Sequence, residues 1–384
     1  MSWVKKTLGD ISSNIQTGPF GSQLHQSDYS ERGIPVVMPK DLIDGRISEE
    51  SIARVSKEHA ERLKRHKIES GDILYSRRGD VGRCAFTTER EKDWLCGTGC
   101  LRVTVDRDKA IPKFIFFQLQ KTETIGWVIN HAVGSTMLNL NTSILCSVPI
   151  EVPEIEVQEK IVNYLSVYDE LIENNKKQIK LLEEAAQRLY KEWFIDLRFP
   201  GYEDCKIVDG VPSGWKKVYL PDIAPIVTGK KDANFGTDDG KYLFFTCSQE
   251  PIKAPSYSFD CDAVILAGNG DFNVKLYRGR FEAYQRTYVF SPFDSDNLFL
   301  LYYAVKDNMR QLFQGASGST IKFLTKRMLE EIKVFIPDDT TMHKFNNFCE
   351  VYQRKIEVLK QQINDAKEAR DRLLPKLMNG EIEV

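Results

Sequence analysis

The fold of this chain is determined chiefly by one stretch, IVNYLSVYDELIENNKKQIKLLEEAAQRLYKEW, residues 161–193. Apolar side chains return there at alternating steps of four and three, the heptad spacing of a helix that pairs with another helix along a seam. At about 1.5 Å per residue such a helix is on the order of 50 Å long. It is expected to end before Phe199, Pro200 and Gly201. The seam consists of Ile161, Leu165, Tyr168, Ile172, Asn175, Ile179, Leu182, Ala186, Leu189 and Trp193.

A second stretch, residues 345–377, repeats this spacing 184 positions later. Lys, Glu, Gln and Asn lie between the seam positions, as on the solvated flank of a coiled coil. The polar seam residues Asn175 and Arg370 are expected to fix register and orientation. We therefore predict two long helices that pair antiparallel. The second seam consists of Phe345, Cys349, Tyr352, Ile356, Leu359, Ile363, Ala366, Arg370, Leu373 and Leu377.

The remainder of the chain is also duplicated. The segment from Gly134 to Pro153 recurs 184 positions later, whereas the front motif beginning at Trp3 recurs at Trp215, 212 positions later. We therefore expect the second half to have lost roughly 28 residues of loop relative to the first. The alternative is two unrelated α+β domains that share common turn residues.

These patterns predict an α+β protein in which two mixed α/β domains are joined by two antiparallel coiled-coil helices, with an approximate two-fold internal repeat. Two such domains, held a set distance apart, suit a bipartite DNA target whose half-sites lie about 34 to 36 Å apart. The predicted boundaries are 1–154 and 200–337 for the two domains, and 155–199 and 338–384 for the helices.

Composition excludes several classes of protein. The net charge of −2 excludes a uniformly basic nucleic-acid binder, so any DNA contact must come from local basic patches. No stretch approaches the roughly 20 apolar residues of a membrane span, and no apolar signal region follows the N-terminus, so we expect a cytoplasmic protein with no membrane partner. The eight cysteines lack the paired spacing of a structural zinc site, and the five histidines are unpaired.

Signatures of catalysis are also missing from the sequence. The segment 236–241 resembles a phosphate-binding loop but has the wrong spacing. No Asn-Pro-Pro-aromatic tetrapeptide is present, and Gly97-Thr98-Gly99 lacks the third glycine of a dinucleotide fingerprint. We expect a protein without a catalytic centre, cofactor or metal of its own.

A loop rich in arginine marks the first half. Arg77, Arg78 and Arg83 surround two glycines after the strand-like segment 72–75. Glycine permits close backbone approach, and arginine binds guanine or phosphate with two parallel hydrogen bonds. The alternative is an ordinary surface turn with solvated arginines. The segment 134–136 offers amides and hydroxyls for phosphate oxygens, or else is a turn that leads into a strand.

The second half carries cations interleaved with aromatic residues, a mixture expected of a nucleic-acid face. In the alternative interpretation the aromatic residues belong to the core. The cations are Lys230, Lys231, Lys275, Arg278, Arg280 and Arg286, and the aromatics are Phe272, Tyr277, Phe281 and Tyr284.

The whole chain resembles the specificity subunits of type I restriction-modification systems. The resemblance rests on the segments 17–22 (TGPFGS), 76–82 (SRRGDVG) and 134–137 (GSTM) with the nearby Leu140 and Asn141, and on the duplicated helices. It implies that the two domains are target recognition domains for double-stranded DNA. It also implies that the helices measure the spacer between half-sites and dock two modification subunits. The second half departs from the pattern, with Gly229-Lys230-Lys231 at the first motif and 267–271 (AGNGD) at the second.

The resemblance further implies that the chemistry belongs to other subunits. S-adenosylmethionine would bind the modification subunits, and ATP and Mg would act on the restriction subunits. The residues expected to contact DNA are Thr17, Gly18, Phe20, Ser22, Arg77, Arg78, Arg83, Ser135, Thr136, Asn139, Asn141, Lys230, Lys231, Asn269, Lys275, Arg278, Arg280, Ser319, Thr320 and Lys322. Two other functions are considered: a coiled-coil scaffold that organises proteins without touching DNA, and a nuclease that acts alone.

Overall fold

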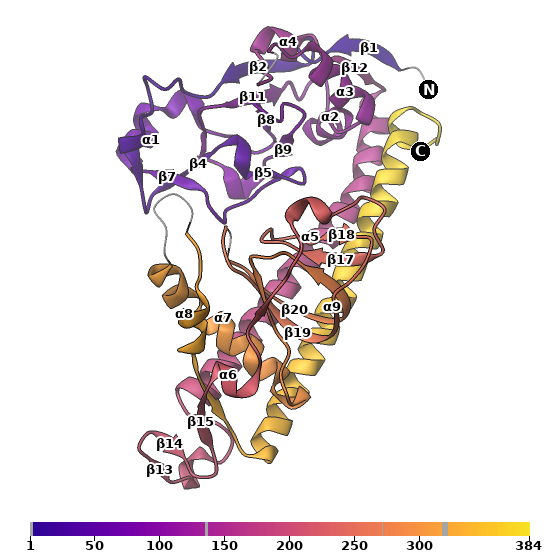
Figure 1. Cartoon of the computed structure of the whole chain (residues 1–384). Coiled ribbons are helices and arrows are strands. Elements are labelled where there is room, and N and C mark those ends of the chain that lie inside the picture. The colour runs from indigo at the N-terminus through magenta and orange to yellow at the C-terminus, as the bar shows by residue number, and fades with distance from the viewer. Residues whose placement is uncertain (1–2, 135–136, 271, 317–321) are drawn as a thin grey trace. The chain divides into compact units, whose positions relative to one another are not determined.

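The computed structural model describes residues 3–134, 137–270, 272–316 and 322–384 (Figure 1). Helices and sheets are mixed throughout, so the predicted α+β class is confirmed. The chain divides into two compact units. Unit 1 comprises 1–174 and 362–384, and unit 2 comprises 175–361. Each unit therefore contains one end of each heptad segment.

The two heptad segments form the longest helices of the described chain. α5 (Ile155–Tyr190) has 36 residues and α9 (Asp339–Met378) has 40. α5 continues into a short π-helical segment, Lys191–Ile195, before the chain turns. Every seam side chain is buried or half-buried, and none is exposed. The apolar stripe thus provides the packing face of both helices.

Contacts within each unit show that α5 and α9 run antiparallel (Figure 1). In unit 1, the Lys160 ammonium donates to the Val384 carbonyl oxygen at 3.2 Å, and Arg370 donates to Asp169 at 3.1 Å. From Lys160 to Asp169 the position along α5 advances, while the contacted residue moves back from Val384 to Arg370, as antiparallel helices require. In unit 2, the rings of Trp193 and Phe345 lie 6.1 Å apart.

The core of unit 1 is closed by the end of the chain. Ile161 and Leu165 of α5 share a buried cluster with Leu374, Leu377 and Met378 of α9. Unit 1 also contains two four-stranded sheets, and strands of the first contribute to this cluster. The first has the order β2 (Ser12–Thr17), β11 (Cys100–Val105), β8 (Ile73–Ser76), β9 (Cys84–Phe86), and the second has the order β10 (Leu95–Cys96), β4 (Ile34–Val37), β7 (Ala53–Val55), β3 (Tyr29–Ser30).

Smaller elements complete unit 1. Its helices are α1 (Lys57–Arg62), α2 (Pro112–Leu119), α3 (Thr122–His131) and α4 (Thr142–Cys146). Two further strand pairs are β1 (Val4–Thr7) with β12 (Pro149–Val152), and β5 (Leu42–Ile43) with β6 (Arg46–Ile47). α2 lies against β9 and β11 and fills the core with three phenylalanines, Phe114, Phe116 and Phe117.

Unit 2 is built on a single six-stranded sheet. Its order is β16 (Val227–Thr228), β21 (Thr287–Phe290), β19 (Phe259–Ala267), β20 (Val274–Ala283), β17 (Tyr242–Phe245), β18 (Ile252–Ala254). α7 (Leu298–Gly315) packs on β19 and β20. The remaining elements are α6 (Leu220–Ile223), α8 (Lys326–Glu330) and two strand pairs, β13 (Ile207–Val208) with β14 (Val211–Pro212), and β15 (Lys216–Tyr219) with β22 (Lys333–Ile336).

The internal repeat extends to the register of single residues. In unit 1 Lys5 pairs with Glu151, and in unit 2 Lys217 pairs with Phe335, the same pairing after shifts of 212 and 184 positions. α4 and α8 have equal length and begin 184 positions apart. The four strands β2-β11-β8-β9 have the same order and antiparallel directions as β16-β21-β19-β20. Each unit is therefore one copy of a common fold.

The expectation that the second half lacks only loop residues is wrong. Arg77 follows Gly18 by 59 positions, whereas the equivalent Gly268 follows Gly229 by 39, so most of the shortening falls in this segment. In unit 1 the segment contains β3 to β7 and α1, whereas in unit 2 it contains β17 and β18, which extend the main sheet. Where unit 1 has a small second sheet, unit 2 therefore has two strands added to its main sheet, and this difference accounts for most of the shortening.

A buried ion-pair cluster joins three helices of unit 1. The Asp169 carboxylate of α5 accepts from Lys113 of α2 at 2.8 Å and from Arg370 of α9 at 3.1 Å. Burial alone would raise the pKa of Asp169, but the charges and hydrogen bonds of Lys113 and Arg370 bring it below its ordinary value. The carboxylate is thus charged in the folded protein, and it balances the positive charges of two cations that are largely removed from bulk solvent.

We expect Asp169→Asn to lower the free energy of unfolding of unit 1 by about 3 kcal/mol, because Lys113 loses its carboxylate partner and Arg370 keeps only Asp371. Denaturant unfolding at pH 7 measures the loss, with Glu170→Asn on the exposed face of α5 as the control. Because the folded pKa is lowered, this stabilisation is present above the unfolded value of about 4 and is lost as pH falls through the folded value. The two curves should therefore converge in acid, and equal stability at pH 7 would contradict the assignment.

Candidate nucleic-acid interface

The arginine loop of unit 1 leaves the end of β8 in a backbone frame that is hydrogen-bonded on both sides. The Arg77 amide donates to the Gly99 carbonyl at 2.8 Å, and the Leu140 amide donates to the Arg77 carbonyl at 2.8 Å. Two residues further on, Gly79 adopts φ +75° and its amide donates to the Leu138 carbonyl at 3.1 Å. The positive φ favours glycine. The position of the loop is thus fixed by the fold.

Unit 2 contains the same frame with different side chains. The Gly268 amide donates to the Arg286 carbonyl at 2.8 Å, and the Leu324 amide donates to the Gly268 carbonyl at 2.8 Å. Gly270 follows at φ +68°. Gly268 therefore stands where unit 1 has Arg77, and Asn269 stands where unit 1 has Arg78.

Side chains of the first loop form a small cluster of unsatisfied polar groups. The Arg77 guanidinium lies 5.8 Å from the centre of the Phe20 ring, which is 56% exposed. Arg77 Nε and Asn139 Oδ1 are buried without a hydrogen-bond partner among the described residues. Buried polar atoms are normally paired in folded proteins. Arg77 Nε–H is therefore suited to donate a hydrogen bond to a ligand or water, and Asn139 Oδ1 to accept one. Arg78 is exposed, and Arg83 is paired with Asp80 at 2.9 Å.

The turn that carries Phe20 packs tightly beside this loop. A Cβ atom at Gly18 would lie 2.0 Å from the Gly97 carbonyl oxygen, so only glycine fits. The hydroxyl of Thr98 donates to the Pro19 carbonyl at 3.0 Å. Thr17 pairs with Leu101 in the sheet, and Ser22 is exposed. Gly18 thus allows its backbone to pack closely against that of Gly97, and the same turn carries Phe20 and Ser22 at the surface.

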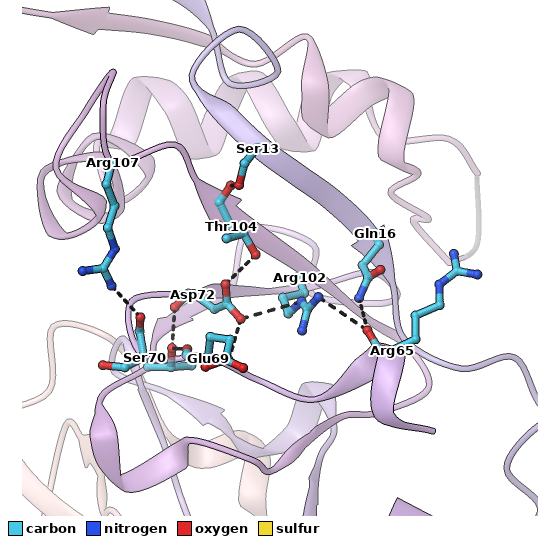
Figure 2. Close-up of polar contacts among 10 residues, drawn as sticks. Ser13, Gln16, Arg65, Glu69, Ser70, Asp72, Arg102, Thr104 and Arg107 are labelled. Carbon is cyan, nitrogen blue, oxygen red and sulfur yellow. Dashed lines mark hydrogen bonds and ion pairs between the residues drawn. The ribbon is translucent and has the colours of Figure 1, made fainter. Parts of the chain in front are cut away.

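A buried carboxylate anchors the other end of β8 (Figure 2). Asp72 is 1% exposed and accepts from the Thr104 hydroxyl at 2.6 Å and from the Glu69 amide at 2.8 Å. Arg102 of β11 lies 3.7 Å from the same carboxylate. These contacts tie the start of β8 to β11. They hold the strand from which the arginine loop extends.

Several cations of unit 2 have partners within the chain. Arg278 donates to both carboxylate oxygens of Glu350 at 3.2 and 2.9 Å, and Arg280 pairs with Asp260 at 2.9 Å. Lys275 donates to the Ser248 carbonyl at 2.8 Å and to Asn273.

Three further lysines lie at or near the surface of unit 2. Lys231 lies 4.3 Å from the centre of the Phe235 ring, and Lys322 lies 4.3 Å from that of Phe313. Lys230 is exposed. These three lysines and the exposed Arg286 have no carboxylate partner among the described residues.

The aromatic residues between these cations belong mainly to the core. Phe272 and Phe281 are buried, and Tyr277 packs against the cluster that contains Phe281. The structure thus favours the interpretation in which these aromatic residues belong to the core. Tyr277 and Phe281 lie four positions apart on β20 and therefore point to the same face of the sheet.

Asn141 also has a structural partner. Its side chain accepts from the Ile144 amide at 2.8 Å and caps α4. The remaining predicted residues Ser135, Thr136, Ser319 and Thr320 lie outside the described residues.

A cavity beside Gly268 was not predicted from the sequence. It has a volume of about 160 Å³ and is lined by Thr228, Gly268, Gln285, Arg286, Tyr288, Phe323 and Leu324. Phe323 was missed although it follows Asn139 by 184 positions and occupies the same bridge position. The repeat offset could have identified it.

Among the residues that the structure describes, no group of His, Cys, Asp or Glu side chains could hold a metal ion. Across the same residues, no helix combines the length and apolar character needed to cross a membrane.

The fold and its framed loops define a duplicated recognition protein, and comparison with known proteins identifies the family. The family model described as "Type I restriction modification DNA specificity domain" matches residues 1–184 and 212–368. The chain belongs to this family.

Individual type I specificity subunits are also similar to this chain. The chain is 35% identical over 176 residues to the type I restriction enzyme EcoDI specificity subunit of Escherichia coli, a match that covers 45% of this chain and 39% of that protein. It is 25% identical to the MjaIX specificity subunit of Methanocaldococcus jannaschii, covering 93% of this chain and 88% of that protein. The crystal structure of the S subunit of a type I restriction-modification system from M. genitalium superposes with a TM-score of 0.56 at 18% identity, covering 98% and 96% of the two chains. The shared fold is thereby established.

We expect Asp72→Ala to destabilise unit 1 by about 2 to 3 kcal/mol, because it leaves Thr104 and the Glu69 amide without their acceptor and Arg102 without its counter-charge. Hydrogen exchange followed by mass spectrometry should show faster exchange in β8 and β11. Asp108→Ala, at an exposed turn position, is the control. Equal exchange in the two variants would show that the carboxylate does not hold the strand.

Proposed function

We propose that this chain is the DNA-reading subunit of a type I restriction-modification complex, and that each unit reads one half of an asymmetric bipartite target. The supporting observation is the repeated loop frame, which has Arg77 and Arg78 in unit 1 but Gly268 and Asn269 in unit 2. A common frame with different side chains suits two different half-sites. In this proposal the chain acts in the cytoplasm, without a catalytic role. S-adenosylmethionine, ATP and Mg belong to the partner subunits.

The proposal assigns residues 1–154 and 200–337 to target recognition, and 155–199 and 338–384 to the helices that set the spacer. A helix of 36 or 40 residues has a length of about 54 or 60 Å. One turn of DNA separates half-site centres by roughly 34 to 36 Å. Helices of this length are therefore of the right order to set the distance between two half-sites.

Two modification subunits are proposed to dock on the helices. Tyr164 and Val167 of α5 are 58% and 61% exposed, and Phe348 and Val351 of α9, 184 positions later, are 48% and 65% exposed. Exposed apolar side chains at repeated positions indicate protein interfaces. Because the pair occurs once on each helix, two copies of the same partner are expected. Restriction subunits would join through the complex.

Membership of the DNA specificity family favours DNA reading over a scaffold that does not touch DNA. The distinguishing experiment is charge reversal at the first loop. In the complex reconstituted with modification subunits, Arg77→Glu with Arg78→Glu should lower affinity for the target at least about 30-fold, since each lost arginine contact contributes about 1 to 3 kcal/mol. Mapping methylated adenines in the host genome first defines the target.

Binding is measured by gel shift with target and random duplexes, and Arg32→Glu at an exposed position of unit 1 is the control. Unchanged methylation of target sites in the double variant would favour the scaffold. A wild-type complex with no preference for the target over random duplex would reject the DNA-reading function. Cleavage of DNA with magnesium by the purified chain alone would instead support the nuclease.

Docking is tested by native mass spectrometry of the complex. Tyr164→Asp with Val167→Asp should remove one modification subunit, Phe348→Asp with Val351→Asp should remove the other, and the fourfold variant should bind neither. The matched control is Lys176→Asp with Lys360→Asp, two exposed helix positions also 184 apart. Retention of both subunits by the fourfold variant would contradict the docking surface.

A further inference from the structure

Arg78 and Asn269 leave the backbone at equivalent places in their units. Arg78 forms an antiparallel bridge with Asn139, and Asn269 forms one with Phe323, which is 184 positions later. Each is followed by a glycine of positive φ. Each is also preceded by a residue whose amide and carbonyl are both hydrogen-bonded to neighbouring backbone. The two side chains therefore start from the same rigid frame.

Both side chains are available to bind a ligand. Neither the Arg78 guanidinium nor the Asn269 amide has a hydrogen bond or ion pair to another residue in the described part of the chain. Arg83 and Arg278, by contrast, already have carboxylate partners: Arg83 pairs with Asp80, and Arg278 pairs with Glu350. Free polar groups on a fixed backbone are the arrangement needed for recognition, since little further ordering is required on binding.

The difference between the two side chains distinguishes base reading from phosphate contact. Arginine binds phosphate well, but the neutral amide of asparagine gains little from the phosphate charge. In the major groove, arginine pairs with O6 and N7 of guanine, and asparagine pairs with N6 and N7 of adenine. An amide at the position where the other unit has a guanidinium therefore fits two different bases better than two phosphates. In unit 2 the nearby exposed Arg286 remains available for the phosphate backbone.

We propose that Arg78 and Asn269 are equivalent specificity-determining residues of the two half-sites, Arg78 reading a guanine and Asn269 reading an adenine. This inference rests on the proposed function. It adds that the two half-sites differ at corresponding positions because the two units differ at one structurally equivalent residue. Gly268 contributes by close packing, because a Cβ atom there would lie 2.4 Å from the Arg286 carbonyl oxygen, whereas unit 1 has Arg77 at the equivalent position.

The test exchanges the two side chains in the complex with modification subunits. The complex methylates a duplex library in which both half-sites are randomised, and the methylated products are sequenced. Asn269→Arg should change the preferred base from adenine to guanine at one position of one half-site. Arg78→Asn should make the opposite change in the other half-site. Each preference should shift by about tenfold to a hundredfold, and the unaltered half-site should keep its sequence.

Conservative and truncated variants accompany the exchange. Asn269→Gln should keep the adenine preference, because glutamine offers the same donor and acceptor, whereas Asn269→Ala should lose preference at that position alone. The matched controls are Asn234→Arg and Arg32→Asn, at exposed positions of units 2 and 1, which should leave both half-sites unchanged. If the exchanged variants fail to assemble with their partners, the alanine variants Asn269→Ala and Arg78→Ala give the result.

Two outcomes distinguish failure of this inference from failure of the proposed function. If the wild-type complex selects a bipartite sequence but the Arg78 and Asn269 variants keep every base preference and lose only rate, these residues contact phosphate or support the loop, and the inference is overturned. If the wild-type complex selects no sequence from the library, the proposed function itself fails.

Discussion

The antiparallel seam between α5 and α9 is the interaction on which both units depend. In unit 1, Leu165 and Leu377 belong to one buried cluster, and in unit 2, Trp193 and Phe345 belong to another. Each core therefore needs residues from both helices, and the core of unit 1 is completed only by the last turns of the chain. Such contacts between distant segments carry a high loop-closure cost, which the long apolar seam must offset. The buried cluster at Asp169 adds specificity of register to that seam.

A core closed in this way leaves the side chains of the loops after β8 and β19 freer to diverge. The strand pair β1–β12 in unit 1 and its counterpart β15–β22 in unit 2 keep one register, and α4 and α8 begin at equivalent residues. Backbone hydrogen bonds hold the loops after β8 and β19 in the same frame. At Gly268 a Cβ atom would lie 2.4 Å from the Arg286 carbonyl oxygen, so close packing of the frame in unit 2 favours glycine there. The next residue, Arg78 in unit 1 and Asn269 in unit 2, has no such constraint on its side chain and can differ between units.

The heptad spacing and the offset of 184 residues predicted the long helices and the repeat, because burial imposes a strict period on a helix seam. The small sheet of unit 1 was not predicted, since strands of two to four residues such as β3 and β7 are too short to show alternation. In the site, the sequence identified the arginine loop but not which cations already have partners. Glu350 lies 72 positions from Arg278, and a single sequence contains no information about such a pairing.

The pairing of cations explains how a chain with a net charge of −2 can be suited to DNA recognition. Many of its arginines, including Arg83, Arg278 and Arg280, are neutralised by nearby carboxylates, so little positive field extends from the surface as a whole. Non-specific attraction to phosphates is correspondingly weak, and sequence-independent binding by this chain alone would contribute little. Affinity must then come from a few unpaired groups at fixed positions, together with partner subunits. In the proposed function, such a protein would discriminate between bases through these few groups, because only a small part of its binding free energy would be independent of sequence.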